Sequence, residues 1–118
     1  PMTYFTNLFM SGQVEKLKSD AVRMVKDPKY RFFDFEGQFN RAWYNVLNSG
    51  QIKEAIFIFQ MITDLYPNSA NAWDSLAEGY LKAGDKEKAK ELYKKAIELD
   101  PDGPTSYNAK EMLKTIDN

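Results

Sequence analysis

Asp74 and Glu78 are the charged residues whose types and spacing best suit a chemical task in this chain. They stand four residues apart in a segment predicted to be helical, so both carboxylates lie on one helical face. Two carboxylates in this arrangement can meet one lysine or arginine side chain together. The task that this spacing suits is recognition of a cationic group rather than a reaction.

Catalytic chemistry is hard to place, because the sequence contains neither histidine nor cysteine. A serine nucleophile would lack its usual histidine base, and the G-x-S-x-G turn of serine hydrolases is absent from the sequence. The acidic turn from Asp100 to Asp102 lacks the spaced ligands of a calcium loop, and histidine or cysteine metal sites are excluded. Single glycines at turns provide no phosphate-binding loop. We therefore expect no enzymatic activity, no cofactor and no metal.

The composition favours one soluble domain. The chain has 118 residues, a net charge of -1, 43% hydrophobic and 28% charged residues, which indicates neither disorder nor nucleic-acid binding. The apolar stretch 4–10 is interrupted by polar residues and follows no basic run, so we expect neither a signal peptide nor a membrane span. The compartment is open, with the cytoplasm favoured if the chain is complete. Pro1 ahead of Met2 fits either a tag remnant on a small protein or the edge of an excised fragment.

A period of 34 residues organises the chain into helix-turn-helix units. Large apolar residues, small residues, a glycine at the turn and a final proline recur at matching positions. In the later unit these are Trp73, Leu76, Ala77, Tyr80, Gly84, Ala89, Tyr93, Ala96 and Pro101, and one period earlier they are Phe39, Ala42, Trp43, Val46, Gly50, Ala55, Phe59, Ile62 and Pro67.

This pattern resembles the tetratricopeptide repeat family. The resemblance implies an all-α fold, a right-handed solenoid of helix-turn-helix units, and a role as a protein-interaction module. We expect a degenerate first repeat at 36–69 and a second at 70–103, between an N-terminal aromatic segment with an amphipathic helix (1–35) and a capping helix (104–118). Trp43 stands where the family has a small residue, so we expect the first helix pair to be splayed or shifted.

Six helices are predicted, and they span 12–26, 37–49, 52–65, 70–83, 86–99 and 105–117. Residues 1–11 are predicted to be irregular and residues 29–35 to be an extended connector. The last helix is predicted to be shifted by about two positions from the repeat register.

The family's concave groove is lined by the first helix of each repeat. Mapped onto this sequence, it gives Asn40, Tyr44, Asn71, Asp74, Glu78 and Lys82 as partner-binding residues. Tyr44 adds a face for cation-π or apolar contact, so the expected partner is a protein or peptide with a cationic side chain beside an apolar one. The alternative is that Asp74 and Glu78 pair with Lys110 and Lys114 of the last helix.

A second set of candidates is aromatic or aliphatic. Helix 52–65 is apolar on nearly every side, and the second repeat has charged residues in place of its Ile56, Phe57 and Met61. Their cover is either helix 12–26 with the connector, or a second copy of the chain or a missing domain. Residues 4–10 are likewise predicted to dock on another copy, which is favoured, or on a missing domain. The interface candidates are Tyr4, Phe5, Phe9, Ile56, Phe57 and Met61.

A narrower resemblance concerns residues 66–78, which are similar to repeats at the C-terminal end of some bacterial serine hydrolases and esterases. It implies an alternative function, a non-catalytic structural accessory domain of a larger enzyme whose catalytic residues lie outside this chain.

Overall fold

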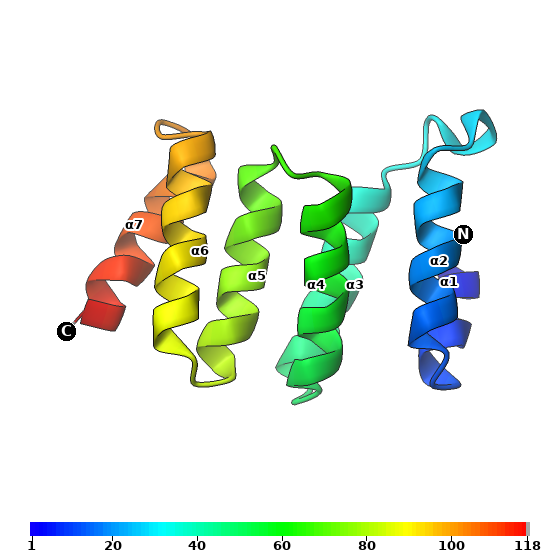
Figure 1. Ribbon diagram of the computed structural model, residues 1–118, viewed down its shortest axis with the longest axis horizontal. Helices are drawn as coiled ribbons and strands as arrows, with labels where there is room; N and C mark the ends of the chain where they lie inside the picture. The colour runs from blue at the N-terminus through cyan, green and yellow to red at the C-terminus, as the bar shows by residue number, and fades with distance from the viewer. Residues whose placement is uncertain (118) are drawn as a thin grey trace.

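The computed structural model describes residues 1–117, which fold into seven α-helices and one short 3-10 turn with no strand in that range. The helices lie side by side in an elongated row, with α1 and α2 at one end and α7 at the other (Figure 1). The elements are α1 (Met2–Met10), α2 (Val14–Val25), η1 (Pro28–Tyr30), α3 (Phe35–Asn48), α4 (Ile52–Leu65), α5 (Ala70–Lys82), α6 (Lys86–Leu99) and α7 (Pro104–Asp117). The chain is an all-α helical repeat solenoid, as predicted.

Local sequence signals set the ends of the repeat helices. Asp34, Ser69 and Asp85 precede α3, α5 and α6, and each side chain accepts a hydrogen bond from a backbone N–H of the first turn. Gly50 and Gly84 adopt φ values of +95° and +88° in the turns after α3 and α5, a conformation that glycine adopts at little cost. These signals produce two helical hairpins, α3/α4 and α5/α6.

The predicted shift of register in the last helix is wrong. α5 begins at Ala70 and α7 at Pro104, so the two first helices start one 34-residue period apart. Only one face of α7 is apolar, because Ala109 is buried whereas Lys110 and Glu111 are exposed. The exposed face of α7 lacks the apolar residues of the family pattern. Their absence produced the apparent shift of register in the sequence.

The prediction that the N-terminal segment is irregular is also wrong, because residues 2–10 form a helix. Phe5 and Leu8 lie on one side of α1, and both are buried. The ring of Phe5 packs 5.0 Å from that of Phe39 and 6.3 Å from that of Phe35, measured between centroids. Packing on α3 therefore stabilises a nine-residue helix that would be marginal on its own.

The predicted extended connector is also only partly right, because it contains the η1 turn and ends where α3 begins at Phe35.

Trp43 is buried, and its ring lies 5.4 Å from the Phe9 ring of α1. α3 and α4 pack on each other less extensively than α5 and α6, as expected for a pair that has an indole at the position of a small residue. The α1/α2 hairpin thus completes the core of the first repeat.

Candidate partner-binding face

The first helices of the successive units, α3, α5 and α7, contact one another and present a shared surface. We call this surface the first-helix face and define it by Asn40, Tyr44, Asp74, Glu78 and Asn108. Four of these residues were predicted to line the groove. Asn108 was not.

Hydrogen bonds join the helices across this face. The Ser75 hydroxyl of α5 donates to Oδ1 of Asn40 on α3 at 2.5 Å. The Asn108 amide of α7 donates to both carboxylate oxygens of Asp74, at 3.1 and 3.3 Å. Asp74 on α5 therefore lies in the middle of three helices whose relative positions are fixed by side-chain bonds.

Asp74 is a buried carboxylate with only 7% of its surface exposed. Burial raises its pKa to about 6, and the negative charge of Glu78 adds to this shift, while the bond from Asn108 opposes it. Within residues 1–117, no lysine or arginine forms an ion pair with Asp74 or Glu78. The face thus holds negative charge that a neutral amide compensates only in part.

Two tyrosines lie near these carboxylates. Burial raises the pKa of the Tyr44 hydroxyl to about 12, with Glu78 and Asp74 adding to the shift and Ser75 opposing it. Tyr93 of α6 is fully buried, and its hydroxyl has no hydrogen-bond partner among the described residues. Burial also raises the pKa of Tyr93, followed by the charges of Glu78 and Asp74. Both phenols therefore stay protonated and lie close enough to the carboxylates to feel their charge.

The remaining predicted groove residues lie at the edge of this face. Asn71 and Lys82 are exposed at the two ends of α5. The alternative pairing with the last helix is wrong, since Lys114 forms its ion pair with Glu111 and the Lys110 ammonium donates to the carbonyl of Pro101. Asp74 and Glu78 are consequently free of the lysines that would have neutralised them.

The predicted interface candidates are divided between core and surface. Phe5 and Met61 are buried in the chain's own core, so they offer no surface to a partner in this arrangement. Phe9, Ile56 and Phe57 are half-buried, and Tyr4 is 40% exposed. Docking of residues 4–10 on another copy stays a prediction, and it now rests on the exposed part of α1.

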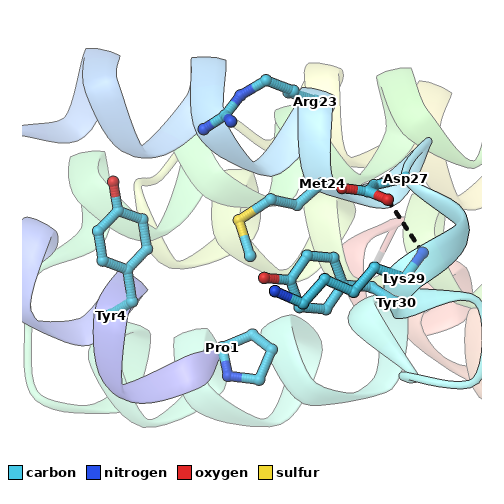
Figure 2. A pocket seen from close by; sticks show the side chains of 7 residues that line it. All are labelled: Pro1, Tyr4, Arg23, Met24, Asp27, Lys29 and Tyr30. Atoms are coloured by element: carbon cyan, nitrogen blue, oxygen red, sulfur yellow. Dashed lines mark hydrogen bonds between the residues drawn. The ribbon is translucent and has the colours of Figure 1, made fainter.

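A cavity of about 650 Å³ lies at the N-terminal end of the molecule (Figure 2). Its lining residues are Pro1, Tyr4, Arg23, Met24, Asp27, Lys29 and Tyr30. Tyr4 and Arg23 both donate hydrogen bonds to Asp20, and these bonds, with Lys16, lower the pKa of Asp20 to about 2. The bond from Tyr4 to Asp20 joins α1 to α2, so we assign Tyr4 a structural role.

Within residues 1–117, no cluster of acidic residues has the arrangement of a metal site. None of the helices in the same range has the length and apolar character needed to cross a membrane.

Comparison with known proteins agrees with this architecture. Residues 36–69 and 70–102 each match a model of the tetratricopeptide repeat. The chain belongs to the tetratricopeptide repeat family. This family generally forms a non-catalytic fold for protein interactions, and its repeats build extended binding surfaces.

One curated relative is a protein named CTR9 homolog from Arabidopsis thaliana. It is 34% identical to this chain over 90 residues, which is 76% of this chain. The match spans only 8% of the relative's length.

Proposed function

We propose that this chain is a non-catalytic interaction module whose first-helix face binds a partner protein through a lysine or arginine beside an apolar side chain. The observation that supports this most directly is Asp74, a buried carboxylate that has no cation within residues 1–117. An uncompensated buried charge destabilises a fold, so its presence favours a role in binding.

The binding chemistry follows from the positions of the two carboxylates. Glu78 is the more accessible of the two, while Asp74 lies deeper under the Asn108 amide. An incoming guanidinium or ammonium group can replace that neutral amide as the donor to Asp74 while it also meets Glu78. A cation adds a charge–charge attraction that the neutral amide does not supply, so the exchange favours the ligand.

Tyr44 accounts for the apolar part of the expected ligand. Its ring packs 5.3 Å from that of Phe59, and the side chain is half-buried, which fixes the aromatic surface before a ligand arrives. A fixed aromatic ring beside two carboxylates suits a cationic residue followed by an aliphatic or aromatic one.

Selection of random peptides of about 12 residues on the immobilised protein tests this function. We expect the recovered peptides to be enriched in lysine or arginine next to apolar residues. Their affinity should fall at least tenfold, or by about 1.4 kcal/mol, for the double variant Asp74→Asn/Glu78→Gln. Their affinity should also fall between about 50 mM and about 0.5 M salt, because ions screen an accessible charge pair.

A matched control separates this face from general electrostatics. Asp102 and Glu98 are exposed carboxylates outside the first-helix face, so Asp102→Asn/Glu98→Gln makes the same change in net charge. Peptides that bind this control and the double variant equally well, or that carry no excess of cationic residues, would show that the proposed face is wrong.

The accessory-domain role that the resemblance of residues 66–78 to hydrolase repeats implies stays a prediction. The same selection separates the two functions, because a purely structural domain would yield no specific peptides.

A further inference from the structure

A second surface, of opposite charge, is formed mainly by α2 and α4 with one residue from α5. A cavity of about 400 Å³ opens where α2, α4 and α5 meet. We call it the α2–α4 groove, and its lining residues are Lys18, Lys53, Ile56, Phe57, Gln60 and Tyr80. Its volume falls in the range of roughly 300–1,000 Å³ that is typical of binding clefts.

The floor of this groove is apolar and not fully covered by the chain itself. Ile56 and Phe57 stay half-buried although α2 packs against α4, and Tyr80 of α5 is also half-buried. One repeat later, the positions of Ile56 and Phe57 are occupied by Lys90 and Glu91. The equivalent second helix of the next unit therefore needs no apolar residues at these two positions.

The rim of the groove is cationic. Lys18 lies with its ammonium 5.6 Å from the centroid of the Phe57 ring, and Lys53 is exposed. Neither lysine forms an ion pair within residues 1–117, and no carboxylate is among the lining residues. This local charge of +2 contrasts with the net charge of -1 of the whole chain.

We propose that the α2–α4 groove docks an acidic amphipathic segment of a partner protein. An apolar side chain of that segment fills the space over Phe57 and Ile56, and its flanking carboxylates meet Lys18 and Lys53. The charge complementarity selects this occupant, since the first-helix face carries the opposite charge and suits a cationic ligand. The inference stands independently of the function proposed for Asp74 and Glu78.

The test uses a fluorescently labelled, acetylated helical peptide of about 14 residues, or about four turns, with leucine and phenylalanine on one face and glutamates flanking them. We expect saturable binding to the full chain. The variant Lys18→Glu/Lys53→Glu should weaken binding at least tenfold, while Lys86→Glu/Lys94→Glu, which reverses two exposed lysines elsewhere, should change it less than twofold. Two further peptides, one with lysine in place of glutamate and one with serine in place of the apolar residues, should bind at least tenfold more weakly.

Several results would overturn this proposal. Absence of saturable binding up to about 1 mM peptide is one, and an equal loss in both lysine double variants is another. A loss of binding in Asp74→Asn/Glu78→Gln would show that the peptide binds the first-helix face and not the α2–α4 groove. Sedimentation that shows a dimer of the unliganded chain, abolished by Lys18→Glu/Lys53→Glu, would identify a second copy as the occupant instead.

Discussion

Replacing Phe5 with alanine should lower the free energy of unfolding by about 3–5 kcal/mol, the usual cost of removing a buried phenylalanine. Phe5 is fully buried and lies against Phe35 and Phe39, so the substitution leaves a cavity between α1 and α3. Urea denaturation followed by circular dichroism measures the change. Since small domains are stable by only about 5–15 kcal/mol, this loss is a large share of the total.

Met10 provides the control on the same helix, because it is 79% exposed. Met10→Ala should change stability by less than about 0.5 kcal/mol.

A chain beginning at Glu36 should lose more stability than Phe5→Ala does, because the truncation also removes the buried side chains of Leu8, Leu17 and Ala21. If that shortened chain melted within a few degrees of the full one, α1 and α2 would not belong to the folding unit.

The sequence predicts the helices of the two repeats closely, because their signals are local. Ser69 and Asp85 are strong N-terminal caps, and Gly84 marks a turn that favours a positive φ. α1 was not predicted, because its nine residues become stable as a helix only when Phe5 packs on α3, about 30 residues further along the chain. Tertiary packing decides the structure of such a segment.

The candidate site could be predicted in part. Family positions predicted Asn40, Tyr44, Asp74 and Glu78 as groove residues, and their role in binding stays a prediction. The role of Asn108 was missed, although it follows Asp74 by one period of 34 residues, because the polar outer face of α7 suggested a shifted register. The repeat pattern predicts that Tyr93 is buried, but the closeness of its hydroxyl to the two carboxylates depends on how α6 crosses α5.

Asp74→Asn should stabilise the fold at about pH 7, by roughly 1–3 kcal/mol, because it removes a charge that the folded state holds unfavourably. The pKa of Asp74 is raised from 3.8 to about 6 in the folded chain, so the folded state binds the extra proton between these values. Stability from this group is therefore lost as the pH rises from about 4 to about 6. Partial solvent contact reduces the effect below the full amount implied by the shift.

Unfolding of Asp74→Asn and of the unaltered chain at pH values from about 4 to about 7.5 measures this effect. The advantage of the variant should disappear near the lower end of that range, where Asp74 is protonated in both states. Asp102→Asn, at an exposed position, should differ from the unaltered chain by less than about 0.5 kcal/mol throughout. A variant that is less stable than the unaltered chain at neutral pH would mean that Asp74 serves the fold.

The most direct test of a cation-binding first-helix face is the affinity of a selected lysine- or arginine-containing peptide as a function of pH. Because Asp74 has a pKa of about 6, only about a tenth of it is ionised at about pH 5. Affinity should fall up to roughly tenfold between about pH 7.5 and about pH 5, and Asp74→Asn should bind weakly with a much flatter pH dependence. Affinity that is unchanged by both the pH and the substitution would contradict the account.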